Sequence, residues 1–224
     1  MSETVKLKAS DGHAFNAYVA KPSGAPHAGL VVIQEIFGVN AHIRSVADGY
    51  AQHGFLAVAP AIFDRIERDV ELSYEGEDPK KAFALMHKVN MDNAVKDVDA
   101  ALKYAGEQSG KPVFVVGYCF GGTLAWLSAT RLHPAAAVGY YGGMIAKFVA
   151  EKPRVPVMLH FGQADDHISA EDVAKIQSAH PEVQIFTYPG AAHAFNRNVG
   201  PSYRPEPAEQ ALERTLAFFK KHGG

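Results

Sequence analysis

The segment Gly117-Tyr118-Cys119-Phe120-Gly121 decides how this sequence folds. The apolar run 113–116 before it is typical of a buried strand, and residues 122–129 after it are helical in composition. A strand, a sharp turn and a helix together form a nucleophile elbow, which exposes a reactive side chain. The flanking glycines fit this turn, because a nearby Cβ would collide with the adjacent strand or helix. We therefore predict that Cys119 is a nucleophile at a helix N-terminus, where free N–H groups favour a thiolate.

Cys119 also has a simpler interpretation. A free cysteine is usually a small buried hydrophobic residue with no chemical role. The strand–turn–helix setting favours the reactive role instead. An acid and a histidine, found further along the chain in the order that a catalytic triad requires, strengthen it.

The composition limits the classes of protein that fit. The chain has 224 residues and a mass of 24.1 kDa, which suits one domain over residues 1–224 with a substantial core. Its net charge of −2 does not favour nucleic acid or an anionic membrane surface as a partner. A single cysteine excludes an internal disulfide, and neither a signal peptide nor a long apolar span is evident. We expect a cytoplasmic protein.

Apolar runs alternate with helical patterns along most of the chain. Asp11-Gly12 predicts a hairpin turn between strands at 5–9 and 15–20. Further strands are expected at 29–33, 55–59, 113–116, 136–140, 157–161 and 184–188, and helices at 41–52, 79–102 (with a break near 90), 122–129, 170–179 and 207–222. This alternation predicts an α/β fold with a mostly parallel central sheet and helices on both faces. The polar stretch 64–78 is a long irregular segment, which in a compact domain is often functional.

Candidate catalytic residues follow two of these strands. In a parallel sheet, ligands bind at the carboxyl ends of the strands. Asp165 and Asp166 follow the strand at 157–161, and His193 follows the strand at 184–188. The order cysteine, acid, histidine is that of the α/β-hydrolase fold, in which the histidine is the general base and the acid orients it. One histidine among 11 means little alone, and either aspartate could instead cap the helix that follows.

The sequence resembles the dienelactone hydrolase (carboxymethylenebutenolidase) family over almost its whole length. The segments that carry the resemblance are 34–40 (Gln-Glu-Ile-Phe-Gly-Val-Asn), 117–122, 137–142 and 193–197. The resemblance implies a single α/β-hydrolase domain with a Cys–Asp–His triad. In the family the acid lies three residues after a glycine and three before an aliphatic residue. Gly162 and Ile168 therefore assign the triad to Cys119, Asp165 and His193.

Glu35 is an unusual residue for its position. It closely follows the apolar run 30–33, and an unpaired buried carboxylate is costly. It could simply be a strand-end residue that reaches water. The resemblance implies instead that Glu35 faces the cysteine and helps to form the thiolate when substrate arrives. The same loop normally supplies one oxyanion-hole amide, so the main-chain N–H groups of Ile36 and Phe120 are predicted to form that hole.

The resemblance also implies how a substrate carboxylate is bound. The family uses two arginines, and Arg197 matches one of them; a guanidinium suits bidentate carboxylate binding. The helix after the polar stretch lacks the second arginine and has Phe83 where a tyrosine is expected. Residues that could replace this arginine are Lys80, Lys81 and Arg65. Tyr140 matches a family active-site tyrosine, although it could equally be a core residue.

The sequence thus predicts a cysteine hydrolase that cleaves a small, carboxylate-bearing lactone or ester through an acyl-cysteine. No metal or organic cofactor is expected, since His160, Asp165, Asp166 and His167 lack an established ligand spacing. The expected partner is a small-molecule substrate, not nucleic acid or membrane, and the protein is expected to be a monomer or small homo-oligomer. The alternatives are a non-catalytic thiol redox sensor, a ligand-binding protein on the same fold, and a general small-ester carboxylesterase.

Overall fold

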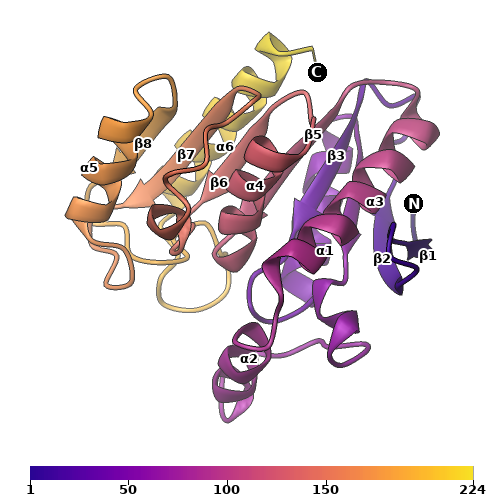
Figure 1. Ribbon diagram of the computed structural model, residues 1–224, viewed down its shortest axis with the longest axis horizontal. Coiled ribbons are helices and arrows are strands. Elements are labelled where there is room, and N and C mark those ends of the chain that lie inside the picture. The colour runs from indigo at the N-terminus through magenta and orange to yellow at the C-terminus, as the bar shows by residue number, and fades with distance from the viewer. Residues whose placement is uncertain (224) are drawn as a thin grey trace.

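An eight-stranded sheet runs through the computed structural model, which describes residues 1–223 (Figure 1). The order across the sheet is β1-β2-β4-β3-β5-β6-β7-β8. The strands are β1 (Ser2–Lys8), β2 (Ala14–Ala20), β3 (Ala28–Ile33), β4 (Phe55–Pro60), β5 (Val113–Tyr118), β6 (Ala137–Tyr140), β7 (Val157–Gly162) and β8 (Gln184–Tyr188). β2 is antiparallel to β1 and to β4, and the other pairs are parallel. The predicted α/β fold is confirmed.

Burial along the strands follows their place in the sheet. Every residue of β3, β4, β6 and β7 is buried, as expected for parallel strands with helices on both faces. The edge strands β1 and β8 are mostly exposed or half-buried. The predicted hairpin joins β1 and β2, and Gly12 has the positive φ of 87° that its turn requires. β4 runs one residue beyond the expected strand 55–59 and includes Pro60, because the last residue of a strand can lack a ladder N–H.

Helices cover both faces of the sheet. They are α1 (Ala41–Gln52), α2 (Asp78–Met86), α3 (Met91–Ser109), α4 (Phe120–Arg131), α5 (Ala170–Ala179) and α6 (Pro205–Lys221), with short 3₁₀ turns η1 (Ile62–Arg65) and η2 (Ile145–Lys147). α1 and α6 share one face, where Tyr50 and Phe219 both contact the Phe55 ring. α3 and α4 lie on the other face (Figure 1). Within residues 1–223, no helix is both long and apolar enough to cross a membrane.

The helix expected at 79–102 is two helices. α2 ends at Met86, and the Asn90 side chain caps α3 by accepting a hydrogen bond from the amide of Asn93 at 3.0 Å. Asparagine is among the preferred N-cap residues, so the break near residue 90 has a local cause. α2 points away from the sheet, while α3 packs along it (Figure 1). The polar stretch before α2 returns over the carboxyl end of β3. There the Leu72 amide donates a hydrogen bond to the Phe37 carbonyl at 2.9 Å.

Strand register brings the predicted catalytic segments to one edge. Ile33 of β3 pairs with Gly117 of β5, so Glu35 and Cys119 each lie two residues beyond a paired position. Gly162 of β7 pairs with Tyr188 of β8, which places the loops carrying Asp165 and His193 side by side. Since neighbouring parallel strands end at the same edge, residues distant in sequence meet there.

Candidate active site

The turn at Cys119 has the geometry of a nucleophile elbow. Cys119 has φ 55° and ψ −117°, a strained conformation for a residue with a side chain. A Cβ on Gly117 would lie 1.9 Å from the Gly121 carbonyl oxygen, and one on Gly121 would lie 2.4 Å from the Ile33 oxygen. Both glycines are therefore required by close backbone contacts. The predicted strand–turn–helix local structure is confirmed, with Cys119 directly preceding α4.

Two main-chain amides near Cys119 are free to bind an anion. The Phe120 amide is at the first position of α4, where an N–H has no acceptor within its own helix. The Ile36 amide lies in the turn after β3. Within residues 1–223, neither amide donates a hydrogen bond to a protein acceptor. Ile36 and Phe120 also line the same pocket as Cys119.

Asp165 and His193 form a close pair. His193 Nδ1 lies 2.8 Å from Asp165 Oδ2, and the second oxygen, Oδ1, accepts the His167 amide at 2.8 Å. The two loops are held together at Gly162, where a Cβ would lie 2.2 Å from the Ala191 carbonyl oxygen. Asp166 lies at the pocket without contacting His193; its side chain is 85% exposed and 3.6 Å from His167. The structure thus brings Asp165, not Asp166, to the histidine.

The surroundings of His193 favour its protonated form. Burial lowers the pKa of His193, but hydrogen bonds with Asp165 and Cys119 and the charges of both groups outweigh it and raise the pKa to about 10. Because Nδ1 is paired with Asp165, Nε2 is left to exchange a proton with the thiol. At neutral pH the imidazole of His193 is therefore protonated and positively charged.

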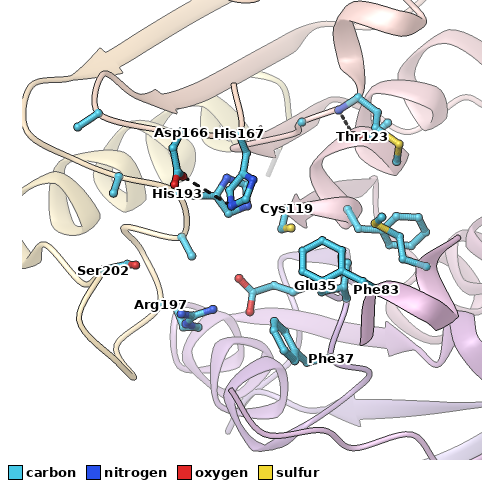
Figure 2. Close-up of a pocket in the computed structure, with 18 residues that line it drawn as sticks. Glu35, Phe37, Phe83, Cys119, Thr123, Asp166, His167, His193, Arg197 and Ser202 are labelled. Atoms are coloured by element: carbon cyan, nitrogen blue, oxygen red, sulfur yellow. Dashed lines mark hydrogen bonds and ion pairs between the residues drawn. The ribbon is translucent and has the colours of Figure 1, made fainter. Parts of the chain in front are cut away.

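Glu35 is buried at the same edge. It is 1% exposed, and its Oε2 accepts a hydrogen bond from the Tyr74 hydroxyl at 3.1 Å. Its Oε1 is buried and has no partner within residues 1–223. A buried carboxylate oxygen without a donor is costly, so its retention beside a pocket points to a chemical role. Glu35, Cys119, His193 and Arg197 all face the pocket (Figure 2).

The pocket at this edge has a volume of about 610 Å³. Its polar side includes Glu35, Cys119, His193 and Arg197. Its apolar side is formed by the turn after β3, by α2, by the start of α4 and by the residue before η2. The principal apolar side chains are Phe37, Phe83, Met86, Phe120 and Met144. A concave apolar pocket with a few convergent polar groups is typical of a small-molecule site.

Arg197 is the cation that the structure places in this pocket among the predicted substrate-binding residues. Its guanidinium stacks on the Tyr74 ring at 4.0 Å from the centroid, and its Nε donates to the Val199 carbonyl at 3.0 Å. The three candidates for a second cation do not line the pocket. Arg65 is bound to Asp97 and Asp11, Lys81 to Glu67, and Lys80 is exposed.

Tyr140 lies behind the pocket and does not line it. Its side chain is fully buried, and its hydroxyl is 2.7 Å from that of Thr215 on α6. This placement does not support the predicted substrate contact, which stays a prediction. The sequence missed the neighbouring Tyr141, whose buried ring packs against His193 at 5.1 Å between centroids. The sequence also missed Tyr74, which lies in the polar stretch that its length had marked as functional.

The described residues 1–223 contain no group of three or more histidine, cysteine or acidic side chains placed to hold a metal ion. His160, considered as a metal ligand from the sequence, lies inside the core. Its ring nitrogens face the hydroxyls of Tyr188 and Thr215 at 2.9 and 3.2 Å. His167 lies at the pocket instead, so the two histidines belong to separate sites.

The mostly parallel sheet, the elbow and the acid–histidine pair at its carboxyl edge define an α/β-hydrolase. The model of the dienelactone hydrolase family matches residues 15–223, and the chain belongs to that family. Among its relatives, the carboxymethylenebutenolidase of Pseudomonas putida is 35% identical over 98% of this chain and 96% of its own length. A protein of Azospirillum brasilense named "Putative carboxymethylenebutenolidase" is 38% identical over 98% and 99%.

A solved structure extends the comparison to three dimensions. The "Putative Dienelactone Hydrolase" of Klebsiella pneumoniae superposes with a TM-score of 0.85 at 29% identity, over 98% of this chain and 99% of that one. Together with the family match, these relatives make the chain a carboxylic ester hydrolase that acts on lactones or esters. The sequence-based prediction of family, fold class and enzyme class is confirmed.

Proposed function

We propose that this enzyme hydrolyses small, carboxylate-bearing lactones or esters through Cys119, Asp165 and His193. The observation that carries the proposal is the 2.8 Å contact between His193 Nδ1 and Asp165 Oδ2, at the rim of the pocket that contains the elbow cysteine. A thiol that served only for packing or redox sensing would not need an oriented histidine behind it.

Acylation begins with the thiolate of Cys119. His193 takes up the single thiol proton, the Glu35 carboxylate assists its removal, and the thiolate sulfur forms a bond to the substrate carbonyl carbon. The carbonyl oxygen becomes an oxyanion, which the Ile36 and Phe120 amides stabilise. The C–O bond to the leaving alkoxide then breaks, and the alkoxide takes a proton from His193. For a lactone, the leaving hydroxyl stays attached to the acyl group.

Deacylation uses the same groups in reverse order. His193, now neutral, removes a proton from a water molecule whose oxygen attacks the thioester carbonyl. The second oxyanion collapses, the C–S bond breaks, and the product acid leaves while Cys119 regains its thiolate. Every proton in this cycle is held by side chains of the protein or by water, so the proposed mechanism requires no cofactor.

The choice of a carboxylate-bearing substrate rests on Arg197. It lines the pocket, and its contacts with Tyr74 and Val199 fix its position without an ion pair to a neighbouring acid within residues 1–223. A guanidinium fixed in this way is suited to accept a carboxylate as a hydrogen-bonding partner. The apolar wall opposite suits the carbon skeleton of a small ring.

We also propose that the enzyme works in the cytoplasm. A mechanism that depends on a free thiol is favoured by a compartment in which thiols stay reduced. The chain has one cysteine, so its only possible disulfide would be with another molecule and would block the reaction.

Activity on a matched set of small lactones and aryl esters tests the function. We expect hydrolysis by the wild type, stoichiometric inactivation by iodoacetamide, and a folded but inactive Cys119→Ala variant. Electrospray mass spectrometry of the enzyme quenched during turnover should show an acyl adduct on the peptide containing Cys119. Full activity in a folded Cys119→Ala variant would exclude this mechanism.

The apolar wall of the pocket favours a second candidate, a general small-ester carboxylesterase. Phe37, Phe83 and Met86 offer hydrophobic contact to any small acyl group, and the pocket has one arginine instead of two. The two candidates differ in one ratio. A carboxylated lactone should be hydrolysed faster than its methyl ester if Arg197 selects the substrate, and equally fast if the enzyme is a general esterase.

A further inference from the structure

Tyr74 touches both charged groups of the pocket without lining the pocket itself. It lies in the irregular segment between η1 and α2, and its side chain is half-buried. Its hydroxyl is 3.1 Å from Glu35 Oε2, while its ring lies under the Arg197 guanidinium at 4.0 Å from the centroid. One side chain thus contacts the proposed proton acceptor through its hydroxyl and the proposed carboxylate-binding cation through its ring face.

The direction of the hydroxyl proton is fixed by Asn40. The Oδ1 of Asn40 accepts the Ile43 amide at the start of α1, so its Nδ2 must face the other way. That Nδ2 donates to the Leu72 carbonyl at 3.0 Å and to the Tyr74 hydroxyl oxygen at 3.2 Å. An amide nitrogen can only donate, so the Tyr74 oxygen accepts there and its proton is directed to Glu35.

The segment that carries Tyr74 is fixed against the end of β3. Gly38 and Glu71 form a β-bridge, and a Cβ on Gly38 would meet the Val70 carbonyl oxygen at 1.8 Å. The Tyr74 ring also packs edge-on against Phe37 at 4.5 Å between centroids. Burial, and then the charge of Glu35, raise the pKa of the Tyr74 hydroxyl, so it keeps its proton and remains a donor at neutral pH.

Glu35 and Arg197 bear opposite charges near one pocket, yet they form no ion pair within residues 1–223. An ion pair would satisfy both charges and withdraw both from the substrate. Tyr74 offers each group a different partner, and leaves Glu35 Oε1 and the outer guanidinium nitrogens free.

We propose that Tyr74 is a positioning residue with two separable effects. Its hydroxyl fixes Glu35 with Oε1 free to assist removal of the Cys119 proton, and its ring holds Arg197 in place to bind the substrate carboxylate. The proposal rests on the function proposed above for Glu35 and Arg197. Removing the hydroxyl should therefore impair thiolate formation, whereas removing the whole ring should also impair substrate selection.

The first test needs no substrate. The rate of Cys119 alkylation by iodoacetamide, followed from pH 5 to 9, reports thiolate formation directly. Tyr74→Phe should slow alkylation at neutral pH about tenfold, because a hydrogen bond to a charged group contributes at least this much. Glu35→Gln should slow it as well, and Tyr74→Phe should add less than about twofold in the Glu35→Gln background, since interacting residues are not additive.

The second test compares substrates. In Tyr74→Phe, the ratio of kcat/KM for a carboxylated lactone to that for its methyl ester should stay within about twofold of the wild type, because the ring that holds Arg197 is kept. In Tyr74→Leu the ratio should fall about tenfold, mainly through KM for the carboxylated substrate. Circular dichroism and thermal unfolding establish that each variant is folded.

Tyr18→Phe is a matched control. The Tyr18 hydroxyl also donates to a carboxylate, Asp48 Oδ1 at 2.8 Å, but it does so between β2 and α1, away from the pocket. The Tyr18→Phe variant should change neither the rate of Cys119 alkylation nor the ratio of kcat/KM between the two substrates. Equal alkylation profiles for Tyr74→Phe and wild type would overturn the hydroxyl role, and an equal loss of the substrate ratio in Tyr74→Phe and Tyr74→Leu would overturn the separation. A wild type without esterase activity would refute the proposed function, while the alkylation test would still decide the role of the hydroxyl.

Discussion

At the scale of single residues, the proposed mechanism makes the reactivity of Cys119 depend on a proton that His193 holds. Aspartate, thiol and imidazole interact closely, and the pKa of His193 of about 10 expresses that interaction. Below this pH the imidazole is protonated, so at pH 7 His193 carries a positive charge beside the Cys119 sulfur. Removing the thiol removes two of the causes that raise the pKa and leaves burial, which lowers it, opposed by Asp165 alone.

We therefore predict that Cys119→Ala lowers the pKa of His193. As the pH rises from 6 to 10, the imidazole should lose its proton earlier in the variant than in the wild type. Long-range ¹H–¹⁵N spectra of the histidine rings measure this titration, and the exposed His133 provides an internal reference in the same spectra. Coincident His193 curves in the two proteins would show that the thiol and imidazole do not interact.

Asp165 should be far more important for turnover than its neighbour. Asp165→Asn keeps the shape of the side chain but loses the charge that fixes the His193 tautomer, and the corresponding change in serine proteases costs on the order of 10⁴ in kcat. Asp166→Asn, at an 85% exposed side chain, is the matched control and should stay within about threefold of wild type. Aryl ester hydrolysis at saturating substrate gives both values. The reverse ranking would mean that the His193–Asp165 contact is not the catalytic one.

Arg197→Ala should remove the preference for a carboxylated lactone over its methyl ester. A charge-assisted hydrogen bond contributes roughly 1.5–3 kcal/mol, so kcat/KM for the acid should fall about ten- to a hundredfold. Hydrolysis of neutral aryl esters should change little. Arg154→Ala removes an equally charged but distant, exposed side chain and should leave the preference intact. If Arg197→Ala leaves it intact too, the enzyme is a general esterase.

Sequence patterns identify candidate residues where a motif or a family resemblance gives a local spacing. Cys119 between its glycines and the Asp165 position between Gly162 and Ile168 are of this kind. Tyr74 is not, because its role depends on a loop that folds back over β3 and on Asn40 far away in the chain. Tyr140 carries a motif but turns its hydroxyl to Thr215, a partner 75 positions away, which no local pattern specifies.

At the scale of the elements, the elbow is built from close backbone contact. We predict that Gly121→Ala destabilises the protein by at least about 2 kcal/mol, because its Cβ would meet backbone oxygens that cannot turn away, at 2.4 Å from Ile33 and 2.5 Å from Gln34. Gly49→Ala is the matched control in α1, where nothing lies within 4 Å of the added Cβ. It should stabilise by about 0.5–1 kcal/mol through helix propensity. Urea unfolding measures both, and a stable Gly121→Ala protein would contradict the close packing of the elbow.

Strands and helices of this chain are largely predictable because turn residues separate them. Helix α1 and strand β8 begin and end where the apolar pattern indicates. The helical stretch expected at 79–102, with a break near residue 90, is two helices, and the break falls at the Asn90 cap of α3. The order of strands in the sheet depends on pairing between distant segments, which the pattern of one sequence does not contain.

At the scale of the whole molecule, a buried polar network connects the last strands to α6. Burial lowers the pKa of His160 to about 3, so the ring is neutral in the folded protein. The unfolded chain binds a proton at this histidine below its ordinary pKa of about 6.5. Between these values the unfolded state holds more protons, so stability is full above about pH 6.5 and falls as the pH drops toward 3.

We predict that His160→Gln flattens this acid dependence. The wild type should lose on the order of 3–5 kcal/mol between pH 6.5 and 3 from this group, as each pKa unit contributes about 1.4 kcal/mol. Glutamine keeps a donor and an acceptor for Tyr188 and Thr215 but cannot titrate. His133→Gln, at an exposed position, should leave the acid limb unchanged. Urea unfolding at several pH values measures the free energy of unfolding of both proteins. If it falls with pH equally in wild type and His160→Gln, His160 is not the source of the acid dependence.

Helix α2 has a consequence for how such enzymes diversify. It projects from the sheet and contributes Phe83 and Met86 to the pocket, while every group proposed for the chemistry comes from other segments (Figures 1 and 2). Selection on this helix can therefore alter which acyl group is accepted without disturbing bond cleavage. A chimera that takes residues 78–90 from a homologue should acquire that homologue's substrate range and keep its own catalytic residues. Substrate range could thus change during evolution through this short segment alone.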